Sequence, residues 1–172
     1  MSTLKPEVSS KDHIEGSESA SITIVEYGDY QCPHCAHAYP VIKEIQQTFG
    51  NQIRFVFRHF PLQESHELAF PAALAAEAAA LQGKFWEMHD AIYENQYRLS
   101  EDLFEELAET IGLDVEQFQK DISADNLKEK VEDDFESGVR SGVNGTPSFY
   151  VNGTKFDGGP DELFEMLKES AE

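Results

Sequence analysis

The sequence predicts an α/β fold in which a β-α-β unit and a late β-hairpin flank a long helical segment. Residues 21–27 and 52–58 are rich in β-branched and apolar side chains, and a stretch with helical apolar spacing separates them. Near the end of the chain, an Asn-Gly pair at Asn152 joins two short strand-like stretches, which is typical of a two-residue hairpin turn. Between these parts, residues 64–138 keep a helical period.

The elements of the first part follow one another closely. The polar residues 1–20 predict a flexible N-terminal arm with a short ordered end. After the strand at 21–27, residues 36–49 predict a helix that ends at Gly50. The apolar run in 52–58 indicates a strand that is buried on both faces.

Helices dominate the rest of the chain until the hairpin. We expect them over residues 72–82, 84–95 and 101–111, the last capped by Ser100, then after the caps Asp114 and Asp125, and finally over 161–169. Asp114 with Gln117 has the spacing of a capping box. The hairpin strands are expected at 148–151 and 154–156.

The charge of the chain excludes some classes of partner. The 33 acidic residues against 13 basic ones give a net charge of -20, which repels phosphate backbones and anionic lipid. No apolar run reaches membrane-spanning length, so we expect neither nucleic-acid binding nor membrane insertion. Residues 1–21 lack a secretory signal, which favours a cytoplasmic protein, or a periplasmic one in its mature form. With no further domain for dimerisation, we expect a monomer.

The only two cysteines, Cys32 and Cys35, lie three positions apart, and four roles compete for them. A disulfide closing so small a loop would stabilise the fold by roughly 2 kcal/mol, against roughly 4.7 kcal/mol for a hundred-residue loop. Haem attachment requires a histidine where Ala36 stands. Zinc requires further ligands, for which His59 and His66 are the candidates. A redox centre is the role that the spacing favours.

The residues around the cysteines supply a mechanism for redox chemistry. Cys32 precedes Pro33, which suits the first position of a helix, so the Cys32 sulfur faces free N–H groups and the positive end of the helix dipole. His34 can donate a further hydrogen bond to the Cys32 thiolate. Thiols in such settings have pKa values of roughly 3.5–7.5. Cys35, one turn deeper, would resolve mixed disulfides.

A Cys-x-x-Cys pair at the junction of strand and helix predicts a thioredoxin-like fold. The helical insertion then lies between the second βα part and the C-terminal β-hairpin. We therefore expect a flexible arm over 1–20, a thioredoxin-like domain over 21–63 and 139–172, and an inserted helical domain over 64–138.

Over residues 13–170 the chain resembles the DsbA-like branch of the thioredoxin-fold thiol:disulfide oxidoreductases. The resemblance is carried by Glu26 and by the runs 29–35, 57–62, 83–86 and 145–149. It implies disulfide exchange with protein or peptide thiols, no cofactor, and a separate redox-recycling partner. It also implies that Glu26 exchanges the Cys35 proton, and that a cis Thr146–Pro147 bond holds the substrate backbone.

Other interpretations remain open. Glu26 could simply face water, and Pro147 could simply open a strand. The side chains of His59, Trp86 and His89 are expected to pack in the core rather than to catalyse. A cytoplasmic disulfide reductase, a peroxide-defence role, or a zinc-stabilised binding module without enzyme activity are the alternative functions.

Overall fold

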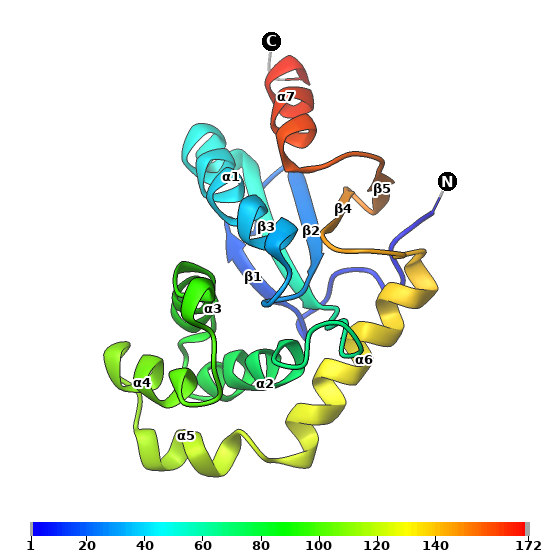
Figure 1. The fold of residues 1–172 in the computed structure, drawn as a ribbon. Coiled ribbons are helices and arrows are strands. Elements are labelled where there is room, and N and C mark those ends of the chain that lie inside the picture. The colour runs from blue at the N-terminus through cyan, green and yellow to red at the C-terminus, as the bar shows by residue number, and fades with distance from the viewer. Residues whose placement is uncertain (1, 171–172) are drawn as a thin grey trace.

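A mixed β-sheet forms the centre of the computed structural model, which describes residues 2–170 (Figure 1). In the described part the sheet has five strands in the order β1-β3-β2-β4-β5. The strands are β1 His13–Gly16, β2 Ile22–Gly28, β3 Ile53–His59, β4 Ser148–Val151 and β5 Thr154–Phe156. Strands β2 and β3 are parallel, and the other neighbouring pairs are antiparallel. This is the predicted β-α-β unit with the hairpin added beside β2.

Helices surround the sheet and form a separate group at one end of it (Figure 1). They are α1 Pro33–Phe49, α2 Ala69–Ala80, α3 Phe85–Glu94, α4 Leu103–Thr110, α5 Val115–Asp121, α6 Asp125–Ser141 and α7 Pro160–Ser170, with two 3₁₀ turns, η1 Gly50–Gln52 and η2 Gln96–Arg98. Helices α1 and α7 lie side by side, and α2 packs on α3 and α6. None of these helices is both long and apolar enough to cross a bilayer.

Successive side chains of β2 and β3 point to opposite faces of the sheet, and an apolar layer forms on each face. Ile24 and Phe55, which are register partners, pack into one buried cluster together with the inner face of α1. Val25 and Val56 point to the opposite face, where they pack in a second cluster with Leu4 and Phe60. Because Glu26 follows Val25, its side chain lies on the α1 side of the sheet.

Most predicted elements are confirmed, and their boundaries differ by a few residues. Asn152 and Gly153 have φ values of 48° and 86°, as the predicted hairpin turn requires. Asp114 caps α5, accepting from the Gln117 amide at 3.0 Å. The Gln117 side chain, however, donates to Asp121 and so does not complete the capping box. The cap predicted at Asp125 is wrong: this residue is the first of α6, where its charge still favours the helix dipole.

The cap predicted at Ser100 is also wrong. Helix α4 begins at Leu103, and Asp102 stands at its N-cap without a side-chain hydrogen bond. The first carboxylates within α4, Glu105 and Glu106, still lie in the turn where negative charge is favourable.

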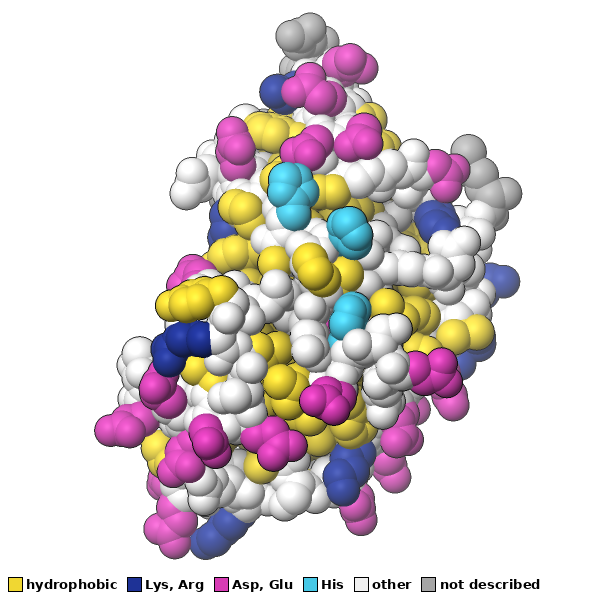
Figure 2. All heavy atoms as spheres, in the orientation of Figure 1, with side chains coloured by type: hydrophobic (Ala, Val, Ile, Leu, Met, Phe, Trp, Pro, Cys, Tyr) yellow, Lys and Arg dark blue, Asp and Glu magenta, His cyan; other side chains and the backbone are white. Residues whose placement is uncertain are grey.

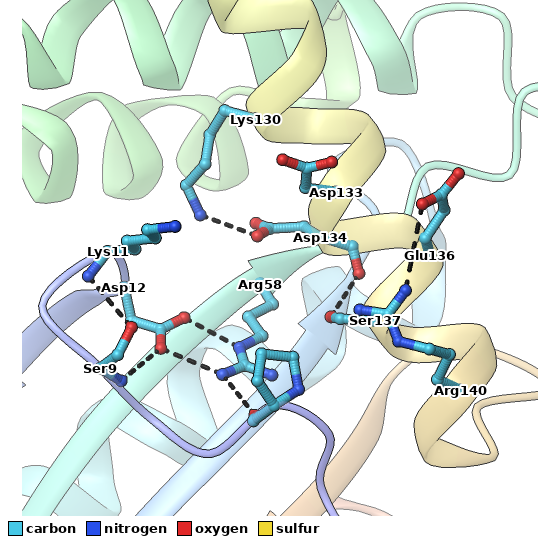
Figure 3. A pocket seen from close by; sticks show the side chains of 11 residues that line it. Ser9, Lys11, Asp12, Arg58, Lys130, Asp133, Asp134, Glu136, Ser137 and Arg140 are labelled. Atoms are coloured by element: carbon cyan, nitrogen blue, oxygen red, sulfur yellow. Dashed lines mark hydrogen bonds and ion pairs between the residues drawn. The ribbon is translucent and has the colours of Figure 1, made fainter.

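Part of the segment expected as an arm lies in the sheet. Strand β1 pairs with β3, and the Leu4 amide donates to the Gly153 carbonyl at 2.8 Å. The buried Arg58 guanidinium explains why the N-terminal segment packs against the sheet. A buried guanidinium needs hydrogen-bond acceptors, and this segment supplies them. It donates to both Asp12 oxygens, at 2.8 and 3.0 Å, and to the Pro6 carbonyl (Figure 3). The division into arm, thioredoxin-like domain and insertion stays a prediction.

Candidate active site

The two cysteines lie at the start of α1, directly after β2. Cys32 is the N-cap residue with extended backbone angles, and Pro33 takes the first helical position as predicted. Cys32 is 4% exposed whereas Cys35 is completely buried, and both are free thiols in the structure. Both thiols are thus shielded in this structure, and Cys35 is the more deeply buried of the two.

Hydrogen bonds make the two thiols unequal in acidity. The Cys35 thiol donates to the Cys32 sulfur, and together with the backbone amides of Cys35 and His34 it lowers the pKa of Cys32 to about 5. Burial, which opposes ionisation, raises the pKa of Cys35 well above its ordinary value. At neutral pH the favoured state is thus a Cys32 thiolate beside a neutral Cys35.

His34 contributes through its backbone in this structure. Its side chain is exposed, and the hydrogen bonds of residues 2–170 include none from its imidazole to Cys32. The amide of His34 is one of the groups that lower the Cys32 pKa. A direct role for the His34 imidazole stays a prediction.

Glu26 lies buried beneath the cysteine turn rather than facing water. It is 3% exposed, and its Oε2 atom has no hydrogen-bond partner among the described residues. Burial, and then the charge of Cys32, raises the pKa of Glu26 to about 8. Gly28 makes room for this carboxylate: a Cβ there would lie 2.9 Å from Glu26 Oε2 and 2.5 Å from the Phe57 ring.

Thr146 and Pro147 approach the cysteines from the far end of the chain. They precede β4, which pairs with β2 through Glu26 and Phe149. The Thr146–Pro147 peptide bond is cis, and the Cys32 thiol donates to the Thr146 carbonyl at 3.7 Å. Since Pro147 has no N–H, it offers no backbone donor to the reactive sulfur.

Asp29 is a site residue whose role the sequence reasoning missed. Its carboxylate is fully buried and accepts four hydrogen bonds. Oδ1 accepts from the amides of Gln31 at 2.7 Å and Cys32 at 3.1 Å. Oδ2 accepts from the Leu62 amide at 2.9 Å and from His66 Nδ1 at 2.8 Å. The local signal was available, because an aspartate that bonds amides two and three positions later forms an Asx turn.

Gln96 was missed as well, and no local pattern reveals it. Its Nε2 atom donates to the carbonyls of Tyr30 at 2.8 Å and Cys32 at 3.0 Å. This side chain comes from η2, in the helical segment, and holds both ends of the turn that leads into α1.

The histidines considered for zinc have other partners. His59 is completely buried and bonds Glu77 at 2.8 Å, and His66 bonds Asp29. Within residues 2–170, no group of three or more His, Cys, Asp and Glu side chains is arranged to hold a metal ion. His89 packs in the core as expected, with Nδ1 2.9 Å from the Tyr30 hydroxyl.

Comparisons with known proteins agree with this architecture. The chain is 41% identical over 157 residues to a Na(+)/H(+) antiporter NhaA 1 of Mycolicibacterium vanbaalenii, a match that covers 90% of this chain and 25% of the antiporter. This chain therefore spans about a quarter of the length of the curated relatives that it matches.

Two solved structures share the fold over nearly the whole chain. A thioredoxin-like oxidoreductase from Silicibacter pomeroyi is 28% identical, with a TM-score of 0.79, covering 95% of this chain and 94% of that one. The thiol-disulfide exchange protein alpha-DsbA2 from Wolbachia pipientis is 23% identical, with a TM-score of 0.81, covering 94% and 88%. The family profile described as Thioredoxin matches residues 8–169. The chain thus belongs to the thioredoxin family and has its DsbA-like form of the fold.

Proposed function

We propose that this protein is a thiol:disulfide oxidoreductase that exchanges disulfides with protein or peptide substrates. The observation that carries the proposal is the unequal cysteine pair: an acidic Cys32 at a helix N-terminus and a buried Cys35 of raised pKa. The thiolate is the nucleophile in disulfide exchange, so this asymmetry assigns attack to Cys32 and resolution to Cys35.

The exchange consists of two balanced steps. The Cys32 thiolate attacks one sulfur of a substrate disulfide, a mixed disulfide forms, and the other substrate sulfur leaves as a thiolate. Cys35 then gives its proton to the ionised form of Glu26, whose share grows as the pH approaches the Glu26 pKa of about 8, and attacks the Cys32 sulfur. The mixed disulfide breaks, the second substrate thiolate leaves, and the protein holds a Cys32–Cys35 disulfide. Run in reverse, the same steps oxidise a substrate dithiol.

The acidity of Cys32 favours oxidation of substrates. Because its pKa is about 5, Cys32 is ionised at pH 7. The difference of about two units between the pKa and the pH stabilises the dithiol form by about 3 kcal/mol relative to a protein with an ordinary thiol at this position. For a two-electron couple this raises the reduction potential by about 60 mV. The reverse direction, as a disulfide reductase or in peroxide defence, is the alternative.

Substrate and partners follow from the same site. The Thr146 backbone, next to a residue without an N–H, suits pairing with an extended substrate segment beside Cys32. We infer a monomer that is recycled by a separate redox partner.

Two measurements test the proposal. Equilibration with glutathione buffers, followed by counting free thiols, gives the reduction potential of the pair. Oxidised protein mixed with a reduced two-cysteine peptide should yield the oxidised peptide, and Cys32→Ser should abolish that yield. No exchange by the wild-type protein with either the peptide or dithiothreitol would overturn the proposal.

The antiporter relatives favour a second candidate. The 41% identical match covers a quarter of a Na(+)/H(+) antiporter, and as a second candidate we propose that this chain exchanges disulfides with a thiol of such a transporter. Antiporter activity in reconstituted vesicles, measured as the sodium-driven change in internal pH, would change on adding oxidised wild-type protein but not Cys32→Ser. Equal activity with both proteins would exclude this role.

A further inference from the structure

The junction of α3 and η2, residues 93–97, lies against the cysteine turn. Gln96 bonds the carbonyls on both sides of that turn. The Tyr93 ring stacks on the Tyr39 ring at 5.5 Å, one helical turn after Cys35, and the Tyr39 hydroxyl donates to Glu94 at 2.7 Å. The junction is therefore fixed to the redox centre through the side chains of Tyr93, Glu94 and Gln96.

Tyr97 points away from this anchored junction into solvent. At 84% exposed, it is the most exposed large apolar side chain in the described part of the chain. An aromatic ring held on a rigid platform beside a reactive group is a low-entropy contact surface, and tyrosine is enriched at recognition sites. Nothing in the packing of the fold requires this ring to be there.

The charged side chains around Tyr97 indicate which kind of charge a partner of this ring would carry. The neighbouring cation, Arg98, is paired with Glu106 at 2.6 Å and also contacts the Tyr97 hydroxyl, which leaves the face of the ring for a second cation. Lys43, on α1, is paired with Asp90 at 3.0 Å. Glu94 forms no ion pair among the described residues. Acidic side chains outnumber basic ones on the face of the molecule that Figure 2 shows. With a net charge of -20, the field at the junction attracts cations.

We propose that Tyr97 is a specificity-determining residue that receives a lysine or arginine side chain of the polypeptide substrate. The proposal rests on the proposed function and names the substrate class of the same site. A tyrosine face binds such a cation through its quadrupole, while the negative charge of Glu94 lowers the cost of bringing the cation near.

The geometry sets where the cation stands in the substrate. Adjacent Cα atoms lie about 3.8 Å apart and an extended chain advances about 3.4 Å per residue. Gln96 already touches the Cys32 carbonyl and Tyr97 follows it in the chain, so the position varied in the test is a flanking residue about three positions from the substrate cysteine. Thr146, whose carbonyl accepts from the Cys32 thiol, would hold the segment nearer the cysteine.

The test uses three peptides that differ only at this flanking position, which carries lysine, norleucine or glutamate. The readout is the ratio of kcat/KM values for the lysine and norleucine peptides. Wild type should prefer lysine over norleucine, and Tyr97→Phe should keep the preference. Tyr97→Leu and Tyr97→Ala should reduce it about two- to five-fold, the range expected for an exposed cation–π contact. Val139→Ala, an exposed apolar position on α6, is the control and should leave the ratio unchanged.

Three outcomes would overturn the inference. If Tyr97→Leu keeps the wild-type ratio, the contact is not with a cation. If wild type prefers norleucine or glutamate, the substrate class is wrong. Exchange with dithiothreitol, which has no flanking residues, is measured in parallel: wild type active on dithiothreitol but indifferent to the peptides refutes this inference alone, whereas inactivity on dithiothreitol refutes the proposed function.

Discussion

The Cys32 sulfur lies 3.7 Å from the carbonyl oxygen of Thr146, a residue 114 positions away in the chain. Antiparallel pairing of β4 with β2 produces this approach, because the loop before β4 then ends beside the loop after β2. The nucleophile and the backbone proposed to hold its substrate are thus positioned by one strand pair.

The acidity of Cys32 is directly measurable. Thiolate absorbance of the reduced protein, followed against pH, should show a transition near the Cys32 pKa of about 5, far below an ordinary thiol. The physical reason is the hydrogen bond from the Cys35 thiol together with backbone amides at the helix start. Cys35→Ala should therefore raise the Cys32 pKa. A transition above pH 8 in the wild type would contradict the assignment of Cys32 as the nucleophile.

The imidazole of His34 gives a separate prediction. Replacing it, as in His34→Leu, should raise the Cys32 pKa and make the protein a weaker oxidant if the ring donates to the thiolate. Because the amide of His34 remains in the variant, any change measures the ring alone. An unchanged pKa and reduction potential in His34→Leu would remove the imidazole from the mechanism, leaving only its backbone.

The two cysteines should also behave unequally toward reagents. In Cys35→Ser the mixed disulfide with Cys32 has no resolving thiol, so covalent substrate adducts should accumulate on a non-reducing gel. In Cys32→Ser the remaining thiol is buried and its pKa is raised, so alkylation should be slow in the folded state. Alkylation in denaturant is the control. Similar alkylation rates for both folded variants would mean that attacker and resolver are wrongly assigned.

Local patterns predicted the parts of this fold that depend on neighbours in sequence. Asn152 and Gly153 predict their turn because few other pairs adopt its positive φ angles. The position of Cys32 at the helix start followed from Pro33 in the same way.

Contacts between distant segments could not be predicted in this way. Gln96 meets Cys32 across 64 positions, and nothing near Gln96 in the sequence distinguishes it from a solvated helix residue. The docking of the N-terminal segment depends on Asp12 and Arg58, which are 46 positions apart, and on the need of a buried guanidinium for acceptors. The polar composition of residues 1–20 therefore indicated an arm although part of it forms an edge strand.

The buried carboxylate of Glu26 should make stability depend on pH. Its pKa is about 8 in the folded protein against 4.5 when unfolded, so between these values only the folded state keeps the proton. The free energy of unfolding should then fall as pH rises from 4.5 to 8. Glu26→Gln removes this dependence and should be more stable than wild type near pH 8. Urea unfolding of wild type and Glu26→Gln, both as the disulfide form in which Cys32 cannot ionise, checks it. In that form burial alone raises the Glu26 pKa, so the fall in wild-type stability should end below pH 8.

The same variant tests the proton transfer. Without a carboxylate to take the Cys35 proton, Glu26→Gln should resolve mixed disulfides more slowly, and its rate should lose the inflection near pH 8 that the Glu26 pKa predicts. Quenched-flow trapping of the mixed disulfide measures this step. If Glu26→Gln resolves at the wild-type rate across this pH range, Glu26 does not handle the proton.

Asp29 should be the residue whose loss damages both the fold and the site. In Asp29→Ala, the amides of Gln31, Cys32 and Leu62 and the His66 ring lose a buried acceptor together. Each buried donor left unpaired costs about 1–3 kcal/mol, and allowing for water entry we expect a loss of about 3–5 kcal/mol in the free energy of unfolding.

Asp29→Asn keeps one acceptor oxygen for the Cys32 turn but places an NH₂ group against the Leu62 amide, so it should lose less. Urea unfolding compares both with Asp133→Ala, an exposed position on α6 that should change stability by less than about 0.5 kcal/mol. If Asp29→Ala unfolds within about 1 kcal/mol of wild type, water replaces the carboxylate and Asp29 does not hold the turn.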